Sequence, residues 1–384
     1  MMSTLIKNAD IVTQGGVLTG ADLFIKDGRI TLSPCEVDEV IDADGAWLLP
    51  GFVDIHCHGG GGLELMDADA CGVGAIADFH LAHGTTSLVA TTLAADDSET
   101  LSALDNIARY MNENPDSSVV GVHLEGPWFN PLQCGAQNTD YIRPPRDGEL
   151  ESLKARYPFI LRVSAAPECE GGMKIANDAK RLGIVAAIGH TDAEFSEVEE
   201  AHERGYSLMT HLYSGMKGVT RKNSFRIAGA VEAGLYLDDM YVELIADGCH
   251  LPVELLRLVY KIKGPDRICL ITDAIRAAGM PDGTRTKIGS MERGLDVIVE
   301  DGVAKLPDRQ SFAGSTATAD RLFKNMMEAT GGNVVAVSKM ASSTPAYLMG
   351  LTDRGEIAEG KRADLVLMDK NYNIKNVFLN GEKI

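Results

Sequence analysis

Short apolar runs recur along the middle of the chain, and each is followed by a stretch with helical periodicity. Helical patterns such as Ala193–Arg204 and Pro252–Ile262 separate the apolar runs. A run that is apolar at every position is typical of a parallel strand buried on both faces. The alternation predicts an α/β fold, a closed (β/α)₈ barrel of the TIM type. The eight predicted strands are Phe52–Ile55, Thr86–Thr92, Val119–Leu124, Ile160–Ala165, Ile184–Ile188, Ser207–Met209, Tyr241–Ala246 and Ile268–Ile271.

The two ends of the chain have a different pattern of short extended runs separated by turns. Asp27-Gly28 and Asn380-Gly381 are hairpin signals between such runs. We therefore expect a small β-sandwich-like domain built from residues 1–50 and 357–384, with residues 51–356 forming the barrel. Its predicted strands are Leu5–Val12, Asp22–Ile25, Arg29–Leu32, Asp364–Met368 and Ile374–Leu379.

Composition excludes several classes of function. The 384 residues include 36 Lys and Arg against 55 Asp and Glu, a net charge of −19 that argues against nucleic-acid binding. No run reaches the roughly 18 to 20 apolar residues of a membrane span, and the first residues lack the apolar core of a signal peptide. The seven cysteines contain no Cys-x-x-Cys pair, so we expect reduced thiols and a cytoplasmic protein.

Polar residues suited to catalysis follow the predicted strands. Active sites of such barrels lie at the C-terminal ends of the strands. Six of the nine histidines fall at these ends, together with carboxylates. The residues concerned are His56, His58, His123, Glu125, His190, His211, Asp247, His250, Thr272 and Asp273.

Imidazole and carboxylate together favour zinc, with iron, manganese and cobalt sharing the same ligands. A catalytic ion needs about three protein ligands, and Glu125, His190 and His211 supply them. His56 and His58 lie on one face of an extended strand, where they add a second position with Glu125 as a bridge. One or two divalent ions are therefore expected, with Asp273 carrying the proton of the attacking water. A single histidine at a strand end is more often structural, but six at one rim favour a metal site.

The ordered motifs resemble the amidohydrolase superfamily, and more closely its branch of N-acetylglucosamine-6-phosphate deacetylases. Each motif alone is weak, whereas the set in this order spans nearly the whole chain. The segment Gly360–Val366 also resembles the superfamily's return to its small β-domain. The matching segments are Pro50–Gly60, His123–Pro127, Gly189–Thr191, Thr210–Tyr213, Ala246–His250, Thr272–Ala274 and Ala313–Thr316.

The resemblance implies a metal-dependent hydrolysis of the N-acetyl group of an amino-sugar 6-phosphate. The expected reaction converts N-acetylglucosamine-6-phosphate to glucosamine-6-phosphate and acetate. In the family, the counterparts of Glu125, His190 and His211 hold the metal, and that of Asp273 is general base and then general acid. The counterpart of His250 contacts the substrate. The family is usually homodimeric, with a residue of the partner subunit reaching the phosphate.

The chain departs from the family's pattern in its substrate loops. Ser214-Gly215 stands where Asn-Ala is common, and Gln137, after Ala136, stands where His is frequent. The phosphate-binding Arg has no clean counterpart, so Arg221, Lys222 and Arg226 are the candidate cations, with a solvated loop as the alternative. N-acetylgalactosamine-6-phosphate and other N-acyl compounds are therefore alternative substrates.

Three other functions fit less well. A cyclic-amide hydrolase would use a carboxylated Lys at the fourth strand, and residues 160–168 contain none. A deaminase would carry His-x-Glu, which residues 188–192 lack. A binding scaffold without catalysis would not need the complete ligand set together with Asp273.

Overall fold

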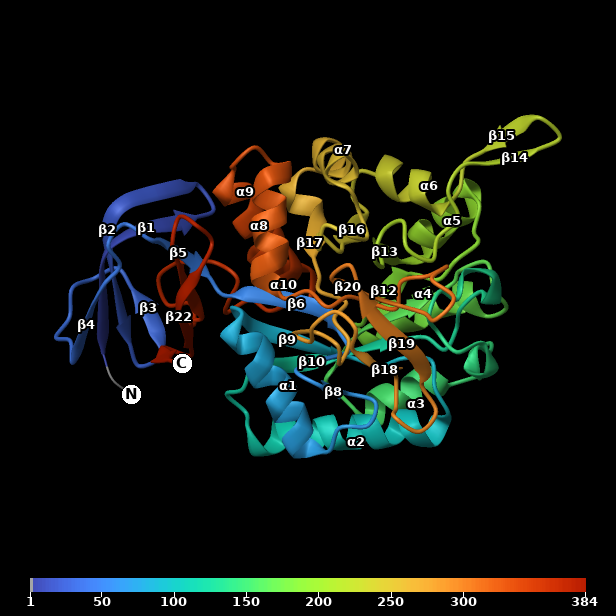
Figure 1. Ribbon diagram of the computed structural model, residues 1–384, viewed down its shortest axis with the longest axis horizontal. Coiled ribbons are helices and arrows are strands. Elements are labelled where there is room, and N and C mark those ends of the chain that lie inside the picture. The colour runs from blue at the N-terminus through green and yellow to red at the C-terminus, as the bar shows by residue number, and fades with distance from the viewer. Residues whose placement is uncertain (1–2) are drawn as a thin grey trace.

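The barrel strands form one parallel sheet in a computed structural model that describes residues 3–384. The order is β17-β16-β13-β12-β11-β10-β9-β6, so every strand lies beside its neighbour in the barrel sequence. All eight apolar runs are strands, which confirms the predicted barrel (Figure 1). They are β6 (Phe52–Cys57), β9 (Thr85–Thr91), β10 (Val119–Glu125), β11 (Ile160–Ala165), β12 (Val185–Ile188), β13 (Tyr206–Met209), β16 (Tyr241–Leu244) and β17 (Ile268–Leu270).

Helices cover the outside of the sheet. The predicted helices at 193–204 and 252–262 are α5 (Phe195–Arg204) and α7 (Val253–Lys263). Pro252 is the N-cap of α7, so its missing N–H costs the helix no hydrogen bond. The remaining helices are α1 (Ala70–Ala82), α2 (Asp97–Glu113), α3 (Glu149–Arg156), α4 (Gly172–Leu182), α6 (Ala230–Tyr236), α8 (Ala319–Ala329), α9 (Val334–Ser338) and α10 (Thr344–Leu348).

The barrel closes through the segment that follows β17 rather than through a ladder between β17 and β6. The N–H of Asp273 donates to the carbonyl of His56 at 2.9 Å, and the N–H of His58 donates to the carbonyl of Ala274 at 2.8 Å. Deeper in the barrel, the Thr272 hydroxyl donates to the Asp54 carboxylate at 2.5 Å. Closure therefore depends on the same segments that carry candidate site residues.

The two chain ends meet in one mixed sheet, which is the basis of the predicted small β-domain. Its order is β23-β22-β21-β5-β1-β2-β3, with β4 also pairing with β1. The antiparallel pair β5–β21 joins the two ends, and a separate apolar core that includes Ile6, Leu23 and Phe378 packs on this sheet. The strands are β1 (Thr4–Thr13), β2 (Gly16–Lys26), β3 (Arg29–Thr31), β4 (Glu39–Asp42), β5 (Trp47–Pro50), β21 (Leu365–Met368), β22 (Ile374–Leu379) and β23 (Glu382–Lys383).

Smaller strands decorate the barrel. A three-stranded sheet of β18 (Arg285–Ile288), β19 (Leu295–Glu300) and β20 (Val303–Lys305) lies between β17 and α8 in the sequence. The hairpin of β14 (Thr220–Lys222) and β15 (Phe225–Ile227) projects from the body of the molecule at the upper right of Figure 1. Residues 59–64 form the short strands β7 (Gly59–Gly60) and β8 (Leu63–Glu64). In the described residues, no helix is long and apolar enough to cross a membrane.

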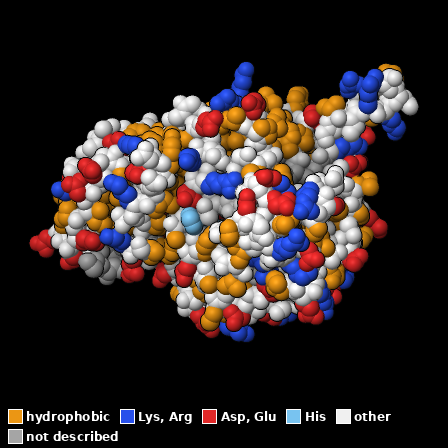
Figure 2. Space-filling model, viewed as in Figure 1, with side chains coloured by type: hydrophobic (Ala, Val, Ile, Leu, Met, Phe, Trp, Pro, Cys, Tyr) orange, Lys and Arg blue, Asp and Glu red, His pale blue; other side chains and the backbone are white. Residues whose placement is uncertain are grey.

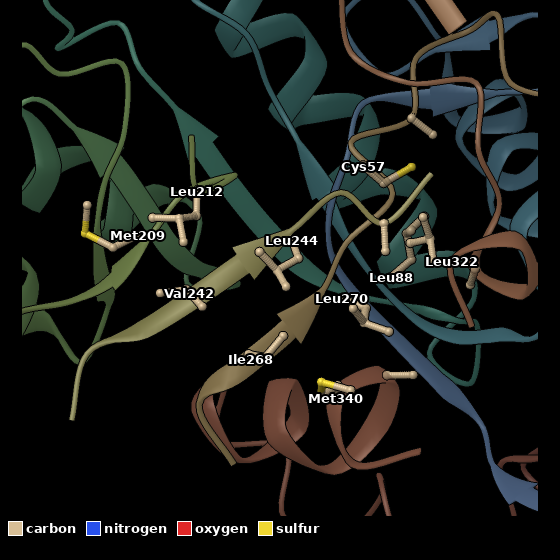
Figure 3. Close-up of a cluster of buried hydrophobic side chains, with 14 of the residues drawn as sticks. Cys57, Leu88, Met209, Leu212, Val242, Leu244, Ile268, Leu270, Leu322 and Met340 are labelled. Carbon is tan, nitrogen blue, oxygen red and sulfur yellow. The ribbon is translucent and has the colours of Figure 1, made fainter. Parts of the chain in front are cut away.

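The main apolar core lies between the barrel strands and the surrounding helices. Figure 3 shows Leu270 next to Leu322 and Met340 from the C-terminal helical region, in the same buried cluster as Val242. Phe52 of β6 and Phe323 of α8 stack with ring centroids 5.5 Å apart, and both side chains are buried. This pair attaches α8 to the strand that carries His56.

Replacing Phe323 with alanine is expected to lower the free energy of unfolding by about 3 to 5 kcal/mol, because it leaves a cavity against Phe52. Urea unfolding of the metal-loaded protein measures the change. Leu32→Ala is the control, since Leu32 is 63% exposed and its truncation should change stability by less than about 0.5 kcal/mol. Equal effects of the two variants would contradict the assigned packing.

Candidate active site

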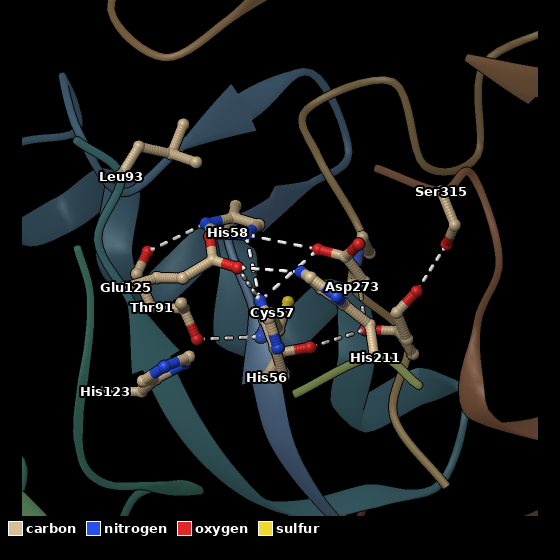
Figure 4. Close-up of polar contacts among 12 residues, drawn as sticks. His56, Cys57, His58, Thr91, Leu93, His123, Glu125, His211, Asp273 and Ser315 are labelled. Carbon is tan, nitrogen blue, oxygen red and sulfur yellow. Dashed lines mark hydrogen bonds and ion pairs between the residues drawn. The ribbon is translucent and has the colours of Figure 1, made fainter. Parts of the chain in front are cut away.

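The residues expected to form the site come together at the mouth of the barrel. Figure 4 shows the side chains of His56, His58, Glu125, His211 and Asp273 directed toward one another. They come from the C-terminal ends of strands that are neighbours or face each other across the barrel. β6 supplies His56 and leads into His58, β10 ends on Glu125, and His190, His211 and Asp273 follow β12, β13 and β17.

The buried carboxylate of Glu125 is the centre of this cluster. Its Oε1 atom lies 3.0 Å from Nε2 of His211 and 3.3 Å from Nε2 of His190. Nε2 of His56 is also 3.3 Å from Oε1, and Nε2 of His58 is 3.3 Å from Oε2. Four imidazole nitrogens from the ends of three strands, β6, β12 and β13, thus face one carboxylate.

The other ring nitrogen of each imidazole is taken by an oxygen of the protein. Nδ1 of His58 bonds the Thr91 carbonyl at 3.3 Å, and Nδ1 of His190 bonds the Gln133 carbonyl at 2.9 Å. Nδ1 of His211 bonds the Ser214 carbonyl at 3.1 Å. Carbonyls only accept, so Nδ1 carries a proton in these three rings, and Nε2 is the nitrogen that is left to bind a metal ion.

The backbone at the strand ends is in an uncommon conformation. His190, His211 and Asp273 have φ values of 49°, 29° and 48°, in the left-handed region that non-glycine residues rarely occupy. Such strain persists only where surrounding contacts impose it, and it is concentrated at functional sites. Here it turns the three side chains inward, over the end of the barrel.

The donor set fits a divalent first-row metal. Glu125, His190 and His211 form one group whose ligand atoms lie within 4.8 Å of one another, and His56, His58 and Glu125 form another. Neutral imidazole and carboxylate are the ligands of zinc and its neighbours in catalytic sites. Glu125 belongs to both groups, which is the arrangement expected of a bridging ligand.

A cavity of about 220 Å³ opens above the cluster. His58, Glu125, His190, His211 and Asp273 form its floor. The wall carries the predicted substrate residues Ala136, Gln137, Ser214, Gly215 and His250, together with Leu93, Ile288 and Phe312. Four of the five predicted ligands and most predicted substrate contacts therefore line one space, whereas His56 is completely buried and does not line it.

Known proteins resemble this chain over nearly its whole length. A model of the amidohydrolase family matches residues 47–384. The chain belongs to the amidohydrolase family. N-acetylglucosamine-6-phosphate deacetylase of Lysinibacillus sphaericus is 33% identical, covering 96% of this chain and 95% of that protein. N-acetylgalactosamine-6-phosphate deacetylase of Escherichia coli O157:H7 is also 33% identical, covering 99% of both.

A solved structure shows the same fold over the whole length. It is a mutant N-acetyl-D-glucosamine-6-phosphate deacetylase of Mycobacterium smegmatis in complex with N-acetyl-D-glucosamine-6-phosphate. The TM-score is 0.90 at 31% identity, and the match covers 100% of this chain and 99% of that one. These similarities place this amidohydrolase in the deacetylase branch that its motifs resemble.

Two wall residues of this amidohydrolase are fixed by polar contacts. The Gln137 side chain donates from Nε2 to Oε2 of Glu125 at 2.6 Å and accepts from the N–H of Ala94 at 2.9 Å. His250 is held by Asp247, with 2.8 Å between Nδ1 and Oδ2, and its ring packs on Phe312 at 4.8 Å. Both side chains are therefore oriented before any substrate binds.

Gly215 lets its loop approach the metal ligands closely. Its φ of 55° lies in the left-handed region, and an added Cβ would come within 3.0 Å of Nδ1 of His190 and of the Gln133 carbonyl. Those two atoms are hydrogen bonded to each other. A side chain at this position would disturb the contact that orients His190.

The three basic residues expected to bind the phosphate lie away from the cavity of their own chain. Arg221, Lys222 and Arg226 are exposed on the β14–β15 hairpin, where Figure 2 shows basic side chains at the upper right. None of them lines the cavity, and no other Lys or Arg of the described residues does so. The cavity of a single chain thus offers a phosphate no cationic side chain.

Sequence reasoning missed a polar pair inside the barrel of this amidohydrolase. Glu243 of β16 and Arg162 of β11 are fully buried and form an ion pair beneath the cluster. Burial raises the pKa of Glu243, but Arg162 and His56 outweigh this effect and lower the pKa to about 2. The signal in the sequence that could have revealed the pair was one charged residue inside each of two apolar runs.

His123, which follows the pattern of the site histidines in the sequence, also lies inside the barrel. Its Nε2 atom is 2.7 Å from the Ser164 hydroxyl, and its side chain does not line the cavity.

The buried carboxylates and imidazoles strongly perturb one another. Burial lowers the pKa of His56 and His58, but Glu125 and Asp273 outweigh it and raise the pKa values to about 9 and about 10. Burial would raise the pKa of Glu125, yet the surrounding imidazoles hold the pKa well below its usual range. The pKa of Asp273 is lowered for the same reason. Both carboxyl groups are therefore ionised at neutral pH.

Metal removal should make stability depend on pH in the alkaline range. In metal-free protein, protonated His56 and His58 stabilise the fold fully below pH 6.5, and this stabilisation is lost as pH rises through about 9 to 10. Metal-loaded protein requires neutral imidazoles and should not show this loss. Urea unfolding of chelator-treated and loaded protein between pH 6.5 and 10 measures the difference. The same pH dependence of stability with and without metal would contradict the assignment of His56 and His58 to the cluster around Glu125 and Asp273.

Proposed function

We propose that this amidohydrolase removes the N-acetyl group of N-acetylglucosamine-6-phosphate, releasing glucosamine-6-phosphate and acetate. The observation that carries the proposal is the position of Asp273 on the cavity floor. Its Oδ1 atom lies 3.1 Å from Nε2 of His58 and 3.4 Å from Nε2 of His56, next to the Glu125 cluster. A carboxylate beside metal ligands, in a cavity open to a substrate, is an arrangement suited to metal-assisted amide hydrolysis.

The site is proposed to hold zinc, as one or two ions, with iron, manganese and cobalt as alternatives. Glu125, His190 and His211 would hold one ion, and His56, His58 and Glu125 the other. A divalent ion bound there would polarise the acetyl carbonyl and lower the pKa of the attacking water. The seven cysteines are unpaired, which supports a cytoplasmic location.

Asp273 is proposed to move the proton during hydrolysis. Because its pKa is lowered, the group is a carboxylate at neutral pH and can accept the proton of the attacking water. The same oxygen then protonates the amine nitrogen as the C–N bond breaks, and acetate remains. His250 and Gln137 would contact the sugar and the reacting amide from the wall.

The phosphate is proposed to be bound across a homodimer. Ser214 and Gly215 line the cavity but bring no charge, and the available cations lie on the projecting hairpin. A hairpin reaching a second copy would deliver Arg221, Lys222 or Arg226 to that copy's cavity. Phe225, 77% exposed on the same hairpin, would be covered by such an interface.

A second candidate substrate, the galactosamine isomer, is supported by the similarity of a known relative. The N-acetylgalactosamine-6-phosphate deacetylase of Escherichia coli O157:H7 is 33% identical to this chain. The N-acetylglucosamine-6-phosphate deacetylase of Lysinibacillus sphaericus has the same identity. The two sugars differ in the configuration of one hydroxyl. N-acetylgalactosamine-6-phosphate is therefore the alternative substrate, to be assayed in parallel.

Asp273→Asn should lower kcat by about 10²- to 10⁴-fold because the amide cannot accept the water proton. Acetate release from N-acetylglucosamine-6-phosphate, its galactosamine isomer and unphosphorylated N-acetylglucosamine measures the effect, with metal content quantified in the same samples. The variant should keep its metal. Near-normal turnover would rule out the proposed role of Asp273, and metal-loaded wild type inactive on all three sugars would rule out the proposed reaction.

Replacing Arg221, Lys222 and Arg226 together with alanine should raise KM for the phosphorylated sugar by at least tenfold, through loss of charge-assisted hydrogen bonds. Mixing this variant with Asp273→Asn should restore activity, because each mixed dimer pairs one intact site with one intact hairpin. Arg109→Ala, on the exposed surface of α2, is the control. Mixed dimers that form without regaining activity would show that the hairpin does not act across subunits.

A further inference from the structure

His56 differs from the other candidate metal ligands in what holds its ring. Nδ1 of His58, His190 and His211 each faces a backbone carbonyl. Nδ1 of His56 instead faces a carboxylate, with 3.2 Å to Oε2 of Glu243. A carboxylate behind a ligating imidazole fixes the tautomer and makes the other nitrogen a stronger donor than a carbonyl does.

Glu243 is held so that both of its oxygens must accept hydrogen bonds. Oε2 accepts from Nδ1 of His56 and, at 3.0 Å, from the backbone N–H of His211. Oε1 pairs with the guanidinium of Arg162. The Glu243 side chain is completely buried, so water cannot replace any of these donors.

Arg162 is itself fixed from several directions. Its guanidinium donates to the Ile55 carbonyl at 3.1 Å, one residue before His56, and to the Thr210 hydroxyl at 3.2 Å, one residue before His211. The ion pair thus connects β11 and β16 across the barrel interior and touches the strands of two candidate ligands. The charge of Arg162 stabilises Glu243 as a buried carboxylate, so an ionised oxygen is held behind Nδ1 of His56.

We propose that Glu243, held by Arg162, is a positioning residue that makes His56 the anchoring ligand of a metal position formed by His56, His58 and Glu125. The inference rests on the proposed metal-dependent function. The other metal position, formed by Glu125, His190 and His211, depends less on Glu243. The reason is that His190 and His211 keep their own carbonyl partners at Nδ1. Glu243 therefore controls whether one ion or two are held.

Glu243→Gln tests this inference because glutamine offers only one accepting end. Its NH₂ group must face either Arg162 or the two donors from His56 and His211, so one set of donors loses its partner. We expect affinity at the His56–His58 position to fall about 10- to 100-fold. Zinc titration against a chromophoric chelator, with metal analysis after dialysis, should give two ions per wild-type chain and one per variant chain.

Glu64→Gln is a matched control. Glu64 is also completely buried and pairs with an arginine, with 3.4 Å between Oε2 and Nε of Arg276, but it has no hydrogen bond to a candidate ligand. This variant should keep two ions. Unchanged stoichiometry and affinity in Glu243→Gln, or a single ion per wild-type chain in excess zinc, would overturn the proposal.

A second measurement does not require the Glu243 variant to fold. In zinc-loaded wild type labelled with ¹⁵N-histidine, the Nδ1 proton of His56 should lie downfield of the carbonyl-bonded Nδ1 protons of His58, His190 and His211, and it is assigned by its loss in His56→Asn. A signal no different from those of the carbonyl-bonded rings would overturn the proposal. Two bound ions without acetate release from any assayed sugar would refute the proposed reaction and leave the positioning role standing.

Discussion

The burial of the Glu125 carboxylate is the constraint on which the rest of the site depends. An ionised carboxylate with 1% exposure is unfavourable unless positive charge or hydrogen-bond donors surround it. Four imidazoles and the Gln137 amide meet this need, two of the imidazoles coming from the end of β6 and the others from the segments after β12 and β13. The contacts with Glu125 help to hold the left-handed backbone at His190 and His211, whose rings lie over the barrel end.

Closure of the barrel and assembly of the site are one event. The hydrogen bond from the Asp273 N–H to the His56 carbonyl fixes the proposed base relative to the first ligand strand. Beneath them, Arg162 and Glu243 form a charged layer where most barrels of this type have branched apolar side chains. Rigid apolar packing outside the barrel, such as the Phe52–Phe323 stack, supports this polar interior.

Much of this arrangement could be predicted from sequence because strong patterns encode it. Buried parallel strands are apolar at nearly every position, and the barrel rule then places His190, His211 and Asp273 at one rim. Glu243 and Arg162 escaped prediction because each is one charged residue inside a run identified by its apolar neighbours, and pairing across the barrel depends on three-dimensional register. The separation of Arg226 from the cavity could not be predicted either, because the length and direction of a hairpin follow from tertiary contacts.

The pairing of β5 with β21 also has a consequence during synthesis. β5 runs directly into β6, but its partner, β21, emerges from the ribosome only after the last barrel strand and helix have been made. Until then, Leu48 and Leu49 border an unpaired sheet edge that can associate with other nascent chains. The barrel must therefore fold while this edge is open, and the pairing with β21 then covers it.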